Sequence, residues 1–383
     1  MIDSATLRSH YTAFLRPGRV LLTGHSHQAW PDVARAALAE CFDDAALHVD
    51  DKWGAAFAAA DEVRGVLAAT LGGQARDYAL DGNTHALVTR FLSALPLARR
   101  RHLVSTAGEF HTLHRQLRRL AEEGVRVTFV DPAPVDTLAA RLASAVTADT
   151  AAVLCSSVLF ETSSVVPGLG ELAAHCRDRA VPLLIDAYHH FVALPFERAA
   201  LGDEVFVLGG GYKYAQWGEG VCFLGVPSGC DLRPVLTGWF ADFAHLADRR
   251  TDAPVQYGDD GADRFAGATY DPVSHYRARA VLRFFAAQGL TPAALRERSL
   301  ELTGQVFAWA DRLGLDVATP RDDARRGAFV SVRVPDAGAA TAALAGRGIH
   351  TDSRGDLLRL GPAPYTTTEE IDRAMEALGA WRR

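Results

Sequence analysis

The sequence predicts an α/β protein in which a mainly parallel sheet is covered by helices on both faces. From residue 78 onward, seven short runs of apolar, β-branched and aromatic residues alternate with segments that have helical spacing. The expected strands lie at 78–80, 102–106, 126–130, 151–155, 181–186, 204–210 and 221–226. The expected helices lie at 85–95, 113–124, 135–146 and 169–180. Ligands of such sheets bind at the carboxyl ends of the strands, so the residues that follow each strand are candidates for a functional site.

The pattern changes after about residue 270, where a smaller α+β unit is expected. This unit would contain one long helix over 271–314, a strand at 328–334, a helix at 337–348, a strand at 357–361 and a closing helix at 368–383. The first 50 or so residues predict an arm and a helix without a strand, which could pack against this unit. The expected division is an N-terminal arm and helix at 1–50, a large domain at 51–270 and a small domain at 271–383.

The composition of the 383-residue chain is that of an ordinary globular protein, with 49% apolar and 22% charged residues. Its net charge of −6 argues against a nucleic-acid partner. No apolar run reaches the ~18–20 residues of a membrane span, and the first residues lack the layout of a secretion signal. The five cysteines have no paired spacing, so we expect reduced thiols in a cytoplasmic protein rather than disulfides or a zinc cage.

Lysine is almost absent from the chain. Of the 40 basic residues only Lys52 and Lys213 are lysines, which leaves 38 arginines. Because arginine cannot lose its proton in a protein, a retained lysine is a candidate for chemistry that arginine cannot perform. Lys52 lies in the charged stretch HVDDKW, where chance retention is the simpler interpretation.

Lys213 follows a buried strand and three glycines in the segment EVFVLGGGYKY. Glycines let the backbone approach a ligand closely. Mostly apolar surroundings would lower the pKa of the lysine and allow it to form a Schiff base with an aldehyde. On this segment alone, a lysine that extends from a strand end to solvent is an equally good interpretation.

Asp186 ends the preceding strand, in VPLLIDAYHH. A carboxylate there is costly to bury without a cationic partner, and the protonated pyridine nitrogen of pyridoxal 5′-phosphate (PLP) is one such partner. Asp186 and Lys213 lie 27 residues apart, so adjacent parallel strands could bring both to one pocket. The alternative is that Asp186 caps the following turn. His189 could support the pocket or be an ordinary core histidine.

Two further features suit a phosphate group and a flat ring. Gly82, Asn83 and Thr84 precede a helical stretch, where backbone N–H groups and the Thr84 hydroxyl could bind an anion. Asn83 could equally be an ordinary N-cap. Phe110 follows the strand at 102–106 and could stack on a ring, although plain packing is more common for such a residue.

Taken together, these residues resemble those of the kynureninases, which are PLP enzymes with the aspartate aminotransferase fold. The resemblance runs in order from about residue 20 to about residue 380. Its main parts are Asp-x-x-His at 186–189, Tyr-Lys-Tyr at 212–214 and DSRGDLLRLGPAPY at 352–365. Phe110, Gly-Trp at 238–239 and Arg-Phe at 264–265 also match. The resemblance implies a mainly parallel seven-stranded sheet, a smaller α+β C-terminal domain, and a homodimer with shared active sites.

The resemblance also implies a role for each matched residue. Lys213 would hold PLP as a Schiff base and move protons at the substrate Cα, and Asp186 would keep the pyridine nitrogen protonated. Tyr212 would donate a proton, and Arg359 would bind the α-carboxylate of an amino-acid substrate with a bidentate fork. Contacts to the cofactor are implied for Asn83, Thr84, Phe110, Asp186, His189, Tyr212, Lys213, Thr269 and, from the other subunit, Trp239.

The expected substrate pocket departs from the kynureninase pattern. The acid after Phe-Pro-Thr is replaced by Leu113, Gly-Pro-Gly by Gly-Glu-Gly at 218–220, and Val-Asn-Tyr by Val-Leu-Phe at 158–160. The Gly-Asn-Ser-Leu-Gly motif reads GHSHQ at 24–28. The cofactor residues are therefore kept better than the substrate pocket.

Ser26 and His27 are expected to contact the substrate at the junction of the domains. A metal site at His25 and His27 would lack a third well-spaced ligand, so no metal is expected.

The expected reaction is hydrolytic Cβ–Cγ cleavage of kynurenine or a related amino acid. The alternatives are an aminotransferase or a carbon–sulfur lyase that uses PLP on a specialised-metabolite amino acid. A cysteine desulfurase is disfavoured because its thiol precedes the C-terminal strand, whereas no cysteine follows Cys230. A non-catalytic relative is disfavoured because Lys213, Asp186 and Arg359 occur together.

Overall fold

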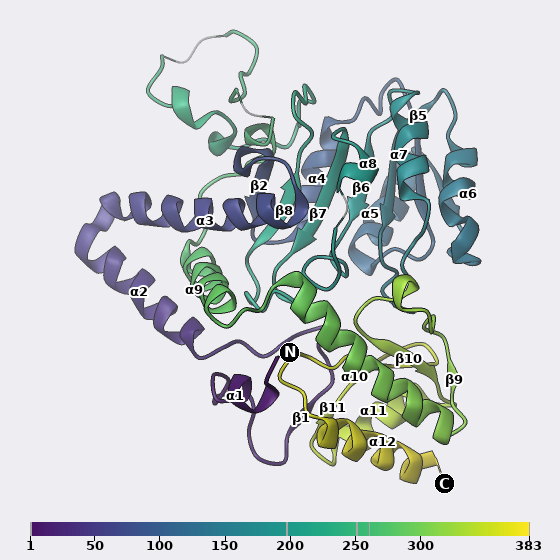
Figure 1. Ribbon diagram of the computed structural model, residues 1–383. Helices are drawn as coiled ribbons and strands as arrows, with labels where there is room; N and C mark the ends of the chain where they lie inside the picture. Colours follow the sequence, from purple (N-terminus) through teal and green to yellow (C-terminus); the bar gives the residue numbers. More distant parts are fainter. Residues whose placement is uncertain (1, 197, 250–251, 260, 383) are drawn as a thin grey trace.

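A computed structural model of the protein describes residues 2–196, 198–249, 252–259 and 261–382. Its largest feature is a seven-stranded sheet with the order β2-β8-β7-β6-β5-β3-β4 (Figure 1). Strand β8 is antiparallel to β2 and β7, and the other neighbouring strands are parallel. The strands are β2 (Tyr78–Asp81), β3 (His102–Thr106), β4 (Arg126–Val130), β5 (Thr150–Ser156), β6 (Leu183–Asp186), β7 (Val205–Gly210) and β8 (Cys222–Gly225). The expected fold class is confirmed.

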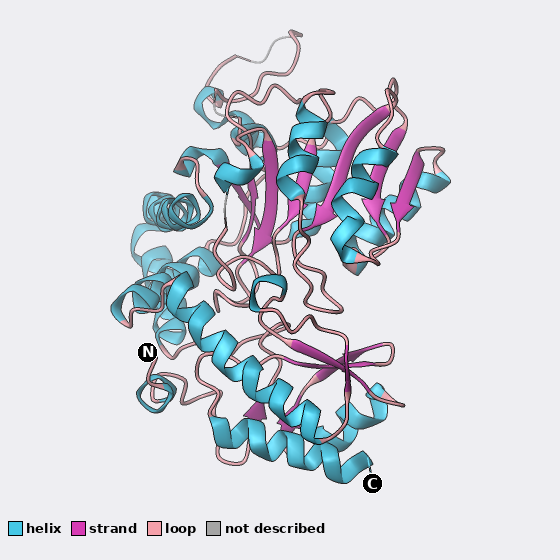
Figure 2. Ribbon diagram, turned by 45° about the vertical axis from the view of Figure 1, so that its right-hand side comes forward, coloured by secondary structure: helices cyan, strands magenta, loops and turns pink. Residues whose placement is uncertain are grey.

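Helices cover both faces of this sheet (Figure 2). Side chains of α4 (Thr84–Ala94) and α5 (His111–Glu122) form one core with the sheet, and those of α3 (Trp53–Leu71), α6 (Leu138–Ala145) and α7 (Leu169–Arg177) form another. Strand β5 serves both cores, since Ala152 and Leu154 belong to one and Val153 and Cys155 to the other. Burial on both faces explains why these strands read as continuous apolar runs. A one-turn helix, α8 (Arg198–Leu201), precedes β7.

The C-terminal part lies below the large sheet in Figure 1 and has its own core. A four-stranded antiparallel sheet has the order β12-β13-β10-β9. Its strands are β9 (Asp316–Val317), β10 (Val330–Arg333), β12 (Asp352–Arg354) and β13 (Leu357–Leu360). The helices that follow the large sheet are α9 (Val273–Ala287), α10 (Pro292–Arg312), α11 (Ala337–Ala345) and α12 (Thr368–Arg382). No helix in the described part of the chain is long and apolar enough to cross a membrane.

The prediction of a single long helix over 271–314 is wrong. Two helices, α9 and α10, replace it because Gly289 adopts a positive φ of 65° and Thr291 begins a new helix. The Thr291 hydroxyl accepts the backbone N–H of Ala294. Pro292 occupies the first helical position, where a backbone N–H has no partner within the helix, so the missing N–H of proline costs no hydrogen bond there.

The prediction that the N-terminal arm contains no strand is also wrong. Helices α1 (Ser4–Arg8) and α2 (Val33–His48) flank a two-residue strand, β1 (Val20–Leu21). This strand pairs in parallel with β11 (Ile349–His350), and Val20 and Leu22 are buried in the C-terminal core. Two residues are too few to show strand periodicity in a sequence. The arm therefore belongs structurally with the C-terminal sheets, whereas the domain boundaries near residues 50 and 270 stay a prediction.

Candidate active site

A cavity of about 280 Å³ opens at the carboxyl ends of β6 and β7. The two strands are parallel neighbours, with Asp186 at the end of β6 paired with Leu208 of β7. The chain leaves β7 at Gly210 and soon reaches Lys213, so the carboxylate and the amine line the same cavity. Seven residues expected from the sequence line it, namely Asn83, Thr84, Phe110, Asp186, His189, Tyr212 and Lys213.

The three glycines before Lys213 make room for aromatic side chains. A Cβ atom at Gly210 would collide with the Tyr188 hydroxyl, and one at Gly211 would collide with the ring of Trp217. The sequence suggested instead that these glycines let the backbone approach a ligand. Close packing against Tyr188 and Trp217 is thus the observed reason for small residues here.

Lys213 is almost fully buried, with 5% of its surface exposed. Burial lowers its pKa to about 7, although the Asp186 carboxylate acts in the opposite direction. The Nζ atom lies 2.8 Å from Nε2 of His189 and 4.6 Å from the centre of the Tyr188 ring. Burial, followed by the charge of Lys213, holds the pKa of His189 well below its usual value. The amine is therefore available in its neutral, nucleophilic form near pH 7.

Asp186 is held by the turn that follows its strand. One carboxylate oxygen accepts the backbone N–H of Tyr188 at 2.8 Å. Burial raises the pKa of this carboxyl group, against the opposing effects of that hydrogen bond and of Lys213. A carboxylate that borders a cavity and is poorly solvated there favours a cationic ligand group.

Glu109 is a buried carboxyl group beside Asp186 that the sequence analysis missed. It accepts hydrogen bonds from the Thr106 hydroxyl at 3.0 Å and from the Ser156 backbone N–H and hydroxyl at 2.9 and 2.6 Å. Burial raises its pKa to about 7, and Asp186 contributes to this rise. Its position directly before Phe110, after a buried strand, was a sequence signal for a functional acid. The group helps to fix the ends of β3 and β5 beneath the cavity.

The start of α4 forms an open cradle. Asn83 is the N-cap, and its side-chain oxygen accepts the Ala86 N–H at 2.9 Å. Thr84 is the first helical residue, and a Cβ atom at Gly82 would meet no atom within 4 Å. The N-cap interpretation of Asn83 is therefore correct, and the helix N-terminus beside it remains suited to an anion.

Tyr212, His27 and Glu219 meet at the rim of the cavity. The rings of His27 and Tyr212 lie 4.9 Å apart, and Nε2 of His27 lies 3.3 Å from the Glu219 carboxylate. The Ser26 hydroxyl lies 3.2 Å from Nδ1 of His27. Burial raises the pKa of Tyr212 to about 12, so its hydroxyl keeps its proton at neutral pH. Glu219 also lines an adjoining cavity of about 700 Å³.

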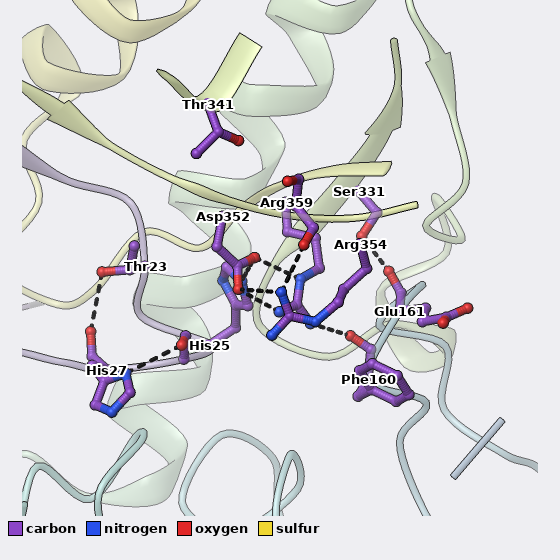
Figure 3. Close-up of polar contacts among 12 residues, drawn as sticks. Thr23, His25, His27, Phe160, Glu161, Ser331, Thr341, Asp352, Arg354 and Arg359 are labelled. Carbon is purple, nitrogen blue, oxygen red and sulfur yellow. Dashed lines mark hydrogen bonds and ion pairs between the residues drawn. The ribbon is translucent and has the colours of Figure 1, made fainter. Parts of the chain in front are cut away.

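Arg359 is buried, with 3% of its side chain exposed, and it does not line the 280 Å³ cavity. Its Nε and Nη2 atoms donate to the two oxygens of Asp352 at 2.7 and 2.5 Å. Nη1 donates at 2.6 Å to the carbonyl of Phe160, a residue that lines the cavity. His25 contacts Asp352, whereas His27 is turned away from this cluster (Figure 3). Arg359 is thus held by Asp352, which in turn contacts His25, a histidine for which the sequence left the role open.

Trp239 and Thr269 lie outside the cavity within one chain. Trp239 is 43% exposed on a 3-10 helix, Trp239–His245, and its Nε1 donates to the Thr269 hydroxyl at 3.2 Å. Exposed Phe243 and Leu246 follow it. The role of Trp239 in a neighbouring subunit stays a prediction.

Comparisons with known proteins relate the sequence to kynureninases. A family model described as the kynureninase C-terminal domain matches residues 295–378. The kynureninase of Deinococcus radiodurans is 30% identical over 333 residues, which cover 84% of this chain and 77% of that enzyme. The kynureninase of Pseudomonas fluorescens is 31% identical over 249 residues, which cover 62% of this chain and 58% of that enzyme. Isopenicillin N epimerase of Streptomyces clavuligerus is 28% identical, with 83% of each chain covered.

Solved structures support the fold. A variant of C-DES with glycine linked covalently to its PLP cofactor has a TM-score of 0.85 at 19% identity and covers 97% of this chain and 98% of that one. The cysteine desulfurase of Thermococcus onnurineus has a TM-score of 0.80 at 16% identity, with 95% and 94% of the chains covered.

Proposed function

Because the chain belongs to the kynureninase family, we propose that it cleaves the Cβ–Cγ bond of kynurenine or a related amino acid by adding water. In this reaction Cβ gains a hydrogen and Cγ gains a hydroxyl group, so kynurenine would yield alanine and anthranilate. Pyridoxal 5′-phosphate is the cofactor, and a homodimer in the cytoplasm that binds a small amino-acid substrate is the form we propose.

The described residues fit this cofactor on four counts. The open start of α4 at Gly82, Asn83 and Thr84 suits a phosphate group. The poorly solvated carboxylate of Asp186 suits a protonated ring nitrogen. Lys213 offers a neutral amine for covalent attachment. The centre of the Phe110 ring lies 5.5 Å from Nζ of Lys213, and this side chain would contact the face of the cofactor ring.

When bound, the cofactor supplies an electron sink that stabilises negative charge at the substrate Cα. The residues of the chain would do the rest. Lys213, with a pKa near 7, would accept and return the proton at Cα. Tyr212 would hold the proton that the leaving fragment receives. Arg359 would bind the α-carboxylate.

The observation that carries the proposal is that Lys213, Asp186 and Tyr212 meet at one cavity in a chain of this family. The residues at 158–160 and 218–220 differ from the kynureninase pattern. A related amino acid is therefore as well supported a substrate as kynurenine itself. An aminotransferase or carbon–sulfur lyase would use the same cofactor residues. Products therefore separate these reactions where the cofactor site cannot.

The test supplies purified holoenzyme with kynurenine, 3-hydroxykynurenine, other aromatic γ-keto amino acids and sulfur amino acids. We expect release of alanine together with an aryl carboxylic acid from at least one γ-keto substrate. A keto acid would indicate an aminotransferase, and sulfide a carbon–sulfur lyase. Either of these without an aryl acid would overturn the hydrolase proposal.

The low pKa of Lys213 predicts a pH dependence for cofactor capture. An amine attacks an aldehyde only when it is neutral, and a pKa of about 7 makes the neutral form predominate above that pH. We expect the rate of PLP uptake by cofactor-free protein, followed by visible absorption, to rise through pH 7 and then level off. The pKa of an unperturbed lysine is 10.5, so a rate that still rises steeply at about pH 9–10 would contradict the prediction.

A further inference from the structure

The ion pair of Asp352 and Arg359 is built across two neighbouring strands. Asp352 begins β12, and Arg359 lies directly opposite it on the antiparallel strand β13. His25 reaches the same carboxylate from the arm after β1, with Nε2 2.9 Å from Oδ1 (Figure 3). The exposed fractions of the three side chains are 0% for His25, 19% for Asp352 and 3% for Arg359, so the contacts are largely shielded from water.

The hydrogen bonds of Arg359 use three of the N–H groups of its guanidinium. A guanidinium group has five N–H bonds. Asp352 receives one from Nε and one from Nη2, and the Phe160 carbonyl receives one from Nη1. One N–H therefore remains on each terminal nitrogen, and a carboxylate accepts two such bonds in a bidentate pair.

The positively charged groups that contact Asp352 outnumber its single negative charge. Arg354 approaches the same carboxylate, with Nη1 3.5 Å from Oδ2. Burial opposes ionisation of Asp352, but hydrogen bonds from His25 and Arg359 hold the pKa of Asp352 well below its usual value. Asp352, Arg354 and Arg359 thus carry one negative and two positive charges among them, and this excess of positive charge would attract an incoming carboxylate.

His25 is a neutral donor in this cluster. Burial lowers its pKa to about 4, so at neutral pH the ring carries one proton. The ring stacks on Phe329 with centres 4.6 Å apart, and a Cβ atom at position 361 would collide with its Nδ1, so Gly361 makes space for it. The Nδ1 atom has no partner among the described residues, which is consistent with the proton on Nε2, facing Asp352.

We propose that His25 and Asp352 are positioning residues that orient Arg359 to receive the substrate α-carboxylate through its two terminal nitrogens. The inference rests on the proposed function, in which Arg359 binds that carboxylate. Asp352 holds the guanidinium through both carboxylate oxygens, and His25 holds Asp352 through Oδ1, the oxygen that also accepts Arg359 Nε. A purely structural ion pair would hold the strands together without affecting carboxylate binding.

The test compares two probes that differ only at the carboxylate, L-alanine and L-alaninamide. Their dissociation constants for the holoenzyme are measured from the change in visible absorption, which requires no turnover. The native enzyme should bind L-alanine at least about tenfold more tightly. In Asp352→Asn, which keeps the side-chain volume, we expect this preference to fall about tenfold. In His25→Phe, which keeps the ring on Phe329 but removes the donor, we expect a smaller fall of about threefold.

Asp356→Asn is the matched control, because Asp356 lies in the same hairpin and is paired with Arg333 at 2.6 Å on the surface. It should retain the native preference, and all variants should keep the absorption of bound cofactor. If Asp352→Asn and His25→Phe retain the native preference, the positioning role is wrong although the proposed function stands. If the native enzyme itself does not distinguish the two probes, the carboxylate role of Arg359 in the proposed function is wrong as well.

Discussion

Replacing Lys213 by alanine is expected to lower turnover by at least about 10³-fold, since one amine would both hold the cofactor and transfer the Cα proton. Lys213 is the one lysine among the residues that line the described cavity, so no other side-chain amine takes its place there. The measurement is steady-state turnover on the best substrate, together with the visible absorption of the isolated protein.

Lys52→Ala provides an unusually close control, because Lys52 is the other lysine of the chain. It lies beside the Trp53 ring at 6.0 Å and does not line the 280 Å³ cavity. Lys52→Ala should keep native turnover and native absorption. The proposal would fail if Lys213→Ala kept both, or if Lys52→Ala lost them.

Replacing Asp186 by asparagine is expected to lower turnover by about 10²–10³-fold while the cofactor stays attached. Asparagine has nearly the same volume and can still accept the Tyr188 N–H, but it carries no negative charge to stabilise a protonated ring nitrogen. The electron sink would then be weaker, and proton removal from Cα would slow. Deuterium exchange at the substrate Cα measures that step directly.

The thermal stability of Asp186→Asn separates this effect from damage to the fold. Burial raises the pKa of Asp186, which means that the carboxylate is poorly solvated in the folded protein without cofactor. Removing the charge should therefore leave the Tm of the cofactor-free protein unchanged or slightly higher. A large fall in Tm would show that Asp186 serves the fold, and the loss of turnover would then carry no catalytic meaning.

The sequence predicted the large sheet well because its strands are buried on both faces. Strands β3 and β4 begin and end at the expected residues, 102–106 and 126–130, since an apolar run bounded by polar residues has clear limits. The wrong predictions arose where a short local feature overrode the pattern of the surrounding sequence. Gly289 and the Thr291 cap interrupt a helical pattern that otherwise continues, and β1 is too short to be recognised without its partner β11.

The candidate site was predictable where an ionisable residue lies at or just after the end of a buried strand. Asp186 and Lys213 each follow a strand, and the pairing of β6 with β7 brings them together. The surroundings of Arg359 were not fully predictable, because His25 and Phe160 come from segments far from it in the sequence, whereas Asp352 lies opposite it on the neighbouring strand. Glu109 was missed although it directly precedes Phe110, because only the structure shows that it is buried and bonded to Ser156.

The contact between His25 and Asp352 joins positions 327 residues apart. During synthesis on the ribosome, the N-terminal arm emerges early and must wait for the last strands before its partners exist. The large sheet can form before that moment, whereas the surroundings of Arg359 cannot. Formation of the proposed carboxylate-binding arrangement around Arg359 would then be a late event in the maturation of the chain, set by its topology rather than by its stability.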